Sequence, residues 1–181
     1  NKSVLKTIKP ETGGTIDSYY NGIHKIGFEV PYRWDVIENE GDGLSLTLQP
    51  GELEHNVKPQ IEASGITPQV MITSSSRDQT MAEQEVNIDF LTIKGAGEPE
   101  IIHNYIFENA DGRKAHIIMT SQKLETPIES VLFKSIQIRF TNSETDYAIV
   151  YMHASDFFRY EVNSFHHVVK TFEFMLDGKM Q

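Results

Sequence analysis

The sequence contains no cysteine, which excludes thiol nucleophiles, disulfides and cysteine-ligated zinc or iron–sulfur centres. It also contains no apolar run long enough to span a bilayer as a helix. Basic residues are scarce, because 16 Lys and Arg stand against 26 Asp and Glu and give a formal charge of −10. Such a chain repels a phosphate backbone and offers no cationic patch, so nucleic acid is not an expected partner.

Recognisable catalytic motifs are missing as well. The sequence contains no Walker A loop, no G-x-G-x-x-G and no nucleophile elbow. The short run Gly95-Ala96-Gly97 precedes Pro99 and is typical of a helix end, not of a phosphate-binding loop. We therefore predict no cofactor and do not predict an enzyme.

The remaining composition is that of a globular protein. The chain has 181 residues, of which 39% are hydrophobic and 23% charged, enough for one domain with a sizeable core. Residues 1–18 are polar and rich in Lys, Thr and Gly, so we expect a flexible tether there and a single domain over 19–181. The start at Asn1 instead of Met favours a secreted or lipid-anchored protein, with an anchor upstream of Asn1. The alternative is that the sequence was shortened artificially, which would remove the Met equally well.

Alternation of apolar and polar residues predicts antiparallel strands. Turn residues at 39–43, at Asp111-Gly112 and at 141–144 separate apolar runs, a pattern typical of hairpins. Pro31 has no N–H for a strand ladder and indicates an edge or a bend near 31–33. The predicted strands cover 28–36, 44–48, 70–73, 101–107, 114–120, 132–140 and 147–153.

Two helices are expected. Thr80 and Glu83 form a capping-box pattern before a helix over 81–93. A second helix follows Ser155 as N-cap, because Phe158, Val162, Phe165 and Val169 recur at helical spacing. The fold class that follows is α+β, with an antiparallel β-sheet flanked by helices in an α/β/α sandwich.

Two short motifs resemble the PsbP-like fold family. The first is Tyr20 followed by Gly27-Phe28-Glu29-Val30-Pro31-Tyr32-Arg33-Trp34, similar to the family's Gly-Phe-x-apolar-x-Pro-x-x-Trp, although Pro31 stands one place early. The second is the closing order of a strand at 147–151, an aromatic-rich helix at 157–170 and Thr171-Phe172-Glu173-Phe174. The resemblance implies the same sandwich and a mostly non-enzymatic binding or assembly role, often in exported or lipid-anchored proteins, with a Ran-regulating branch inside the cell.

Seven histidines invite a search for a metal site. His153 and Asp156 form the best candidate pair, because a strand end and a helix start bring them close in sequence. His103 shares strand parity with Ile101 and Tyr105, and is more typical of a half-buried sheet residue. Adjacent His166 and His167 point about 100° apart on a helix, so they do not chelate one ion together.

Three acidic residues, Glu52, Glu54 and Glu62, lie in the long loop predicted over 50–68. Acidic loops usually lie in solvent, but these carboxylates are the candidates for binding a basic partner. Trp34 could be a recognition anchor, and the family parallel favours packing in the core instead.

The sequence thus predicts a non-catalytic extracytoplasmic module that binds a protein partner or a membrane-associated complex. One alternative is a metal-dependent or hydrolytic enzyme whose site is scattered in sequence, which would need a deep pocket with shifted pKa values. Another alternative is an intracellular regulator of a GTPase, like the Ran-binding branch.

Overall fold

The computed structural model describes residues 4–8, 16–51, 68–76, 97–108, 110, 112, 114–125, 127, 129–176 and 179–180. These residues form twelve strands, one α-helix and one 3-10 turn. The strands are β1 (Val4–Ile8), β2 (Ile16–Asn21), β3 (Ile26–Val30), β4 (Trp34–Glu38), β5 (Ser45–Pro50), β6 (Gln69–Ser76), β7 (Glu100–Glu108), β8 (Lys114–Glu125), β9 (Ser130–Asn142), β10 (Thr145–Ala154), β11 (Glu173–Leu176) and β12 (Lys179–Met180).

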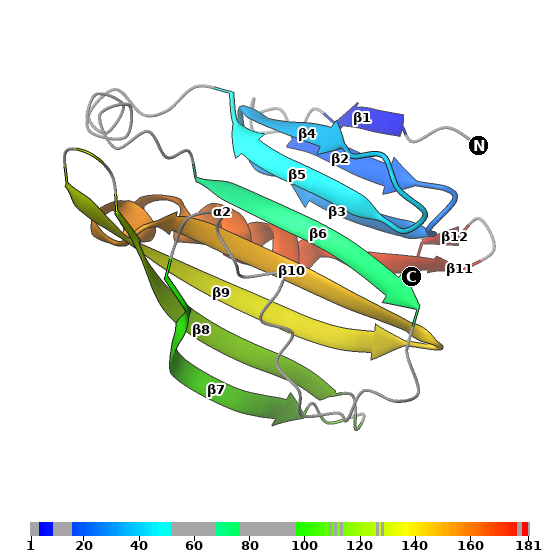
Figure 1. Cartoon of the computed structure of the whole chain (residues 1–181). Coiled ribbons are helices and arrows are strands. Elements are labelled where there is room, and N and C mark those ends of the chain that lie inside the picture. The colour runs from blue at the N-terminus through cyan, green and yellow to red at the C-terminus, as the bar shows by residue number, and fades with distance from the viewer. Residues whose placement is uncertain are drawn as a thin grey trace.

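The strands form two sheets, and every strand pair is antiparallel. The larger sheet has seven strands in the order β4-β5-β6-β10-β9-β8-β7, and the smaller has five in the order β1-β2-β3-β11-β12. Figure 1 shows the larger sheet as a curved layer, with α2 (Phe158–Thr171) on the side where the smaller sheet lies. This arrangement leaves β7 as one edge of the larger sheet.

The chain passes from the smaller to the larger sheet at Pro31, within the run 28–36 that its alternation predicts as one strand. The Trp34 N–H donates to the Pro31 carbonyl at 3.0 Å, and Arg33 has a left-handed φ of 61°. Tyr32 consequently points outward and is 69% exposed, whereas the Trp34 side chain lies in the core and is only 7% exposed. The predicted bend is confirmed, and the single strand is in fact two, β3 and β4.

The predicted hairpins are confirmed. β7 and β8 pair across the Asp-Gly segment, where Gly112 has a φ of 75° that suits glycine. β9 and β10 pair across Ser143 and Glu144. Each strand extends two residues further toward the turn than the predicted ranges 132–140 and 147–153. The strand at 44–48 is β5, with Leu46 and Leu48 buried, and the one at 70–73 is β6.

The C-terminal helix is present, but its start differs from the prediction. Ser155 begins a 3-10 turn, η2 (Ser155–Phe157), and α2 starts only at Phe158. The N-cap of α2 is Phe157, and no side chain caps it. The aromatic residue there packs against its neighbours instead, with its ring centroid 6.0 Å from that of His153. The helix predicted over 81–93 and the loop at 52–67 lie outside the described residues.

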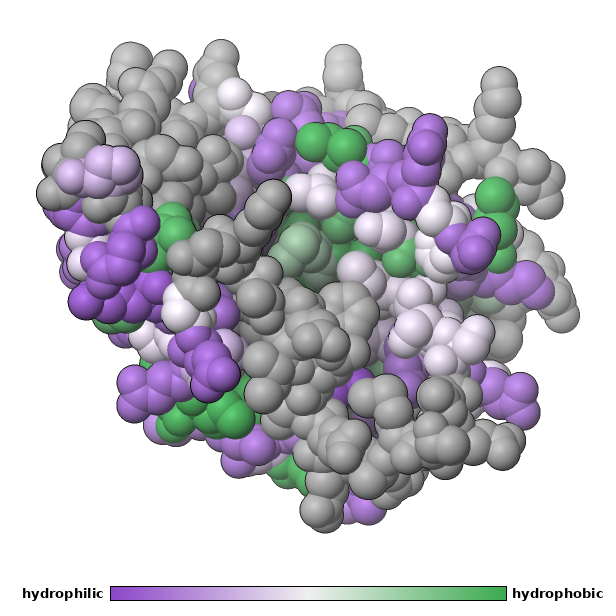
Figure 2. Space-filling model, viewed as in Figure 1, coloured by the Kyte–Doolittle hydropathy of each residue, from purple (hydrophilic) through white to green (hydrophobic). Residues whose placement is uncertain are grey.

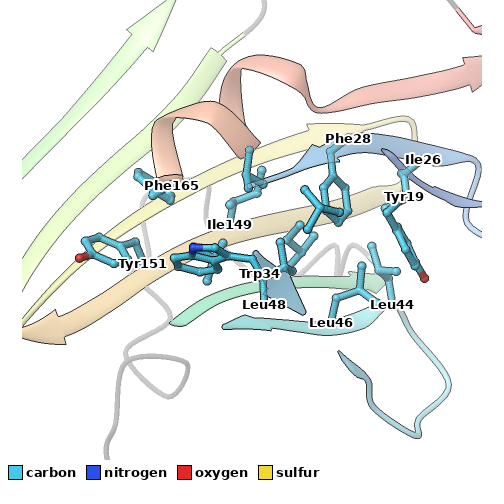
Figure 3. Packing of buried hydrophobic residues seen from close by; sticks show 14 of the residues in the cluster. Tyr19, Ile26, Phe28, Trp34, Leu44, Leu46, Leu48, Ile149, Tyr151 and Phe165 are labelled. Atoms are coloured by element: carbon cyan, nitrogen blue, oxygen red, sulfur yellow. The ribbon is translucent and has the colours of Figure 1, made fainter. Parts of the chain in front are cut away.

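The core lies between the larger sheet on one side and α2 with the smaller sheet on the other. Figure 3 shows Phe165 of α2 beside Tyr151 of β10, and Trp34 near Leu48. The Phe165 and Tyr151 rings stack with centroids 5.8 Å apart. Trp34 therefore packs in the core, as the family parallel indicates. The buried cluster comprises Tyr19, Ile26, Phe28, Val30, Trp34, Leu44, Leu46, Leu48, Val70, Ile72, Tyr147, Ile149, Tyr151, Phe165 and Val168.

One expectation differs from this architecture. The described fold is mostly antiparallel sheet with one short helix, so a sheet flanked by helices overstates the helical part. Strand β1 and the start of β2 also lie within residues 1–18, where the composition indicates a tether. Their register, from Val4 opposite Tyr20 to Ile8 opposite Ile16, adds them to the edge of the smaller sheet. The division into a tether and one domain stays a prediction.

Candidate functional site

The metal candidates His153 and Asp156 lie in different environments. His153 is fully buried at the end of β10, whereas Asp156 is exposed on η2. The His153 Nδ1 accepts a hydrogen bond from the Ala154 N–H at 2.9 Å, so the ring proton lies on Nε2, which finds no partner in the described part of the chain. Burial lowers the pKa of His153 to about 4, which keeps the ring neutral. Among the described residues, no group of three or more His, Asp and Glu side chains is arranged to hold a metal ion.

The other histidines that the structure describes are exposed or partly exposed. His103 is exposed on β7, and His166 is exposed on α2. His167 is partly exposed and forms an ion pair from its Nε2 to Oε2 of Glu29 at 2.9 Å, when protonated, which links α2 to β3. His116 on β8 contacts the Asn104 side chain across the hairpin, and burial followed by the charge of Arg139 lowers the pKa of His116.

The acidic candidates Glu52, Glu54 and Glu62 fall outside the described residues, so their role in partner binding stays a prediction. The shifted pKa values of His153 and Tyr151 have a structural cause. Burial also raises the pKa of Tyr151, whose hydroxyl donates to the Phe158 carbonyl at 2.7 Å within the core. These two groups support the packing between β10 and the helical segment.

The face of the larger sheet that points away from α2 carries buried polar side chains. The hydroxyls of Thr120 and Ser135 are 2.6 Å apart, and the Gln122 amide donates to the Gly97 carbonyl at 3.4 Å. Gln137 lies in the middle of this face, fully buried, and neither of its amide atoms has a hydrogen-bond partner among the residues that the structure describes. Figure 2 looks onto this side and shows a hollow bordered by side chains of intermediate hydropathy. Both Gln137 amide atoms are closed to solvent, so they are not part of an accessible binding surface.

The most distinctive surface is strand β7, in which every one of the nine residues is exposed. Figure 2 shows hydrophobic side chains at the sheet edge where Figure 1 places β7. Contiguous patches of large exposed apolar side chains are unusual on protein surfaces and often mark binding sites. The large apolar residues and their exposed fractions are Ile101 (44%), Ile102 (42%), Tyr105 (52%), Ile106 (53%) and Phe107 (55%).

Register shows that the apolar side chains of β7 occupy both faces of the sheet. Tyr105 lies opposite Ile117 and Phe107 opposite Ala115, and these positions continue through β9 to Ile149 and Tyr147 on the α2 side. Ile106 lies opposite His116 and therefore points to the other face. We call Ile101, Ile102, Tyr105, Ile106 and Phe107 the β7 surface.

Sequence reasoning recognises 101–107 as a strand but not as a surface. Its apolar residues have the pattern of a core strand, and nothing local marks the strand as an edge. The available signal is that large apolar residues stand at both parities of the run, with Tyr105 and Phe107 on one face and Ile106 on the other, which leaves neither face polar. No helix in the part of the chain that the structure describes has the length and apolar character needed to cross a membrane.

Comparison with known proteins supports the fold and leaves the family open. No protein-family profile matches the sequence, and no curated protein matches it either. Among solved structures, the chain is similar to the cyanobacterial PsbP (CyanoP) of Synechocystis sp. PCC 6803. The two share 11% sequence identity and a TM-score of 0.60 over 88% of this chain and 92% of that one. At this identity the likeness concerns the fold alone, and it identifies the architecture of this chain as PsbP-like.

Proposed function

We propose that the protein is a non-catalytic binding or assembly module that works outside the cytoplasm and docks onto a protein or an envelope complex. The observation that carries this proposal is the β7 surface, where five large apolar side chains are each about half exposed. The PsbP-like fold supports the same class of function, because the family resemblance implies binding and assembly roles rather than catalysis.

The β7 surface has the size to contribute to binding. Full burial of one such side chain contributes about 1.5–3 kcal/mol, so covering the exposed halves of five contributes roughly 4–8 kcal/mol. The lost freedom of association costs about 4–15 kcal/mol. Apolar burial alone therefore gives weak binding, and a specific partner must also form polar contacts at this edge.

The test is site-specific photocrosslinking in the native envelope with the full-length chain. A photoreactive phenylalanine analogue at Phe107 should give a discrete adduct with one partner. The same analogue at Tyr160, which is 44% exposed on α2, is the matched control and should not give that adduct.

A second variant separates docking from general stickiness. Adding Ile106→Lys should abolish the Phe107 adduct, because a charge in the β7 surface opposes its burial. Circular dichroism should show an unchanged fold, since Ile106 is exposed. Equal adducts from both positions, or none from either, would refute docking through β7.

A further inference from the structure

Strand β7 has the composition of a central strand although it lies at the edge. Strands that are buried on both faces have nearly continuous apolar runs, whereas strands with one wet face alternate. Between Ile101 and Phe107 the only polar residues are His103 and Asn104, and the apolar side chains point to both faces. This composition fits a strand whose two faces are shielded from water, as they are inside an assembly, and not one whose faces are both exposed.

The usual protection of an edge strand is weak in β7. Natural edge strands are kept from pairing by short length, by Lys or Pro, or by bulges. β7 has nine residues and contains neither Lys nor Pro. Its irregularity lies between Ile101 and His103, near one end, so the stretch from His103 to Glu108 pairs regularly with β8. The outer backbone edge of that stretch is a template for one more strand.

Charges at the two ends of β7 determine which strand fits. Glu100 and Glu108 flank the apolar run, and Glu98 is exposed just before it. On the β8 side, register places Lys114 opposite Glu108 but only Ser121 opposite Glu100. A symmetric pair of two β7 strands centred on Asn104 would place Glu100 opposite Glu108 twice, between chains that each carry a charge of −10. The charges therefore favour a different partner with basic ends.

We propose that β7 accepts an extended segment of a partner protein as an eighth strand of the larger sheet, with apolar residues in its middle and Lys or Arg near its ends. This proposal rests on the proposed function, because it specifies how the same surface binds. Backbone hydrogen bonds along β7 supply the polar contacts that apolar burial lacks, and the acidic ends set the preference for basic residues. The first and ninth residues of a strand are eight steps apart, so the two basic groups lie about 27 Å from each other.

The probe is a labelled nonapeptide, Lys-Val-Thr-Ile-Thr-Tyr-Val-Thr-Lys, with binding to the full chain followed by fluorescence anisotropy. We expect it to bind at least tenfold more tightly than the same peptide with Glu at both ends. Replacing its central residues by Pro should abolish binding, because Pro cannot join a strand ladder. Hydrogen exchange of the β7 amides should slow in the complex.

Charge reversal provides the sharpest control. The double variant Glu100→Lys with Glu108→Lys should invert the preference and bind the Glu-ended peptide more tightly. Glu40→Lys with Glu144→Lys changes the net charge equally at exposed positions in other turns, and should keep the original preference. Equal binding of both peptides, binding of the Pro peptide, or inversion by the control pair would overturn strand addition.

The outcomes also separate this proposal from the proposed function. A Phe107 adduct in the envelope together with no peptide binding would overturn strand addition and leave the docking function intact. Peptide binding without any envelope adduct would overturn the docking function in the envelope and leave strand addition to β7 intact. Sedimentation equilibrium that shows a dimer, lost in Ile106→Lys, would identify a second copy as the occupant and overturn the basic partner.

Discussion

Replacing the buried histidine, His153→Leu, should change how the stability of the protein depends on pH. The His153 ring is enclosed by the core, with its centroid 6.4 Å from that of Tyr151 and 6.0 Å from that of Phe157. No acidic partner contributes to its pKa, and burial alone opposes protonation. The neutral form is therefore the one that the native state holds.

The magnitude follows from the two pKa values. Burial lowers the pKa of His153 from 6.5 to about 4 in the folded protein. Between these values the unfolded chain binds a proton at this site and the native state does not, so the free energy of unfolding falls as the pH falls through the window. One pKa unit corresponds to 1.36 kcal/mol, so the loss from pH 7 to pH 4 is about 3 kcal/mol.

The assay is urea unfolding at pH 7, 6, 5 and 4, followed by the fluorescence of Trp34, the single tryptophan in the chain. Carboxylates titrate in both proteins, so the informative quantity is the difference in stability between wild type and variant at each pH. That difference should shift by about 3 kcal/mol in favour of His153→Leu at pH 4. His166→Leu, at an exposed position on α2, is the control for residue type. A difference that is constant across the four pH values would refute the buried neutral histidine.

Three further substitutions test the packing of the larger sheet, each by urea unfolding. Gln137→Leu should stabilise the protein by about 1–3 kcal/mol, because both amide atoms are buried without partners; a loss of stability would show that they are satisfied. Thr120→Val alone should cost about 1–3 kcal/mol by orphaning the Ser135 hydroxyl, and adding Ser135→Ala should recover most of it, whereas additive losses would contradict the pairing. Phe165→Ala should cost about 3–5 kcal/mol, because its ring fills the space under α2, and a cost below 1 kcal/mol would contradict that packing.

Local signals in the sequence determine much of this fold. The alternation at Leu44, Leu46 and Leu48 directly reports one buried face, and the Asp-Gly at 111–112 marks a hairpin because the turn geometry needs positive φ. The helical stripe through Phe165 likewise predicts α2. These patterns succeed because each depends on residues that are close in the chain.

Other features depend on contacts that no local pattern contains. The run at 28–36 keeps its alternation through Pro31, yet Arg33 takes a left-handed conformation and the strand continues in a different sheet. Ser18 and Asn21 are polar but buried, since β2 is covered by its neighbours and the Asn21 side chain accepts from the Ile23 and His24 N–H groups in a turn. Composition alone assigns such residues to solvent.

The candidate surface shows the same limit. The run 147–153 correctly predicts that His153 is a strand residue, but its complete burial depends on Phe157 and α2. The run 101–107 predicts a strand from its residues, whereas its place at the edge depends on the order of all seven strands. Edge position is a property of the assembled sheet, so the β7 surface became visible only with the topology.

The pairing of β6 with β10 governs the order in which this chain can fold. Strands β7 to β10 follow one another and pair with their sequence neighbours, so they can form early and rapidly. Ile72 pairs only when Ile149 is available, and Gly27 of β3 pairs only when Glu173 of β11 is available, 146 residues later. The core around Phe28 therefore closes only after β11 pairs with β3, and until then its apolar surface is open to aggregation.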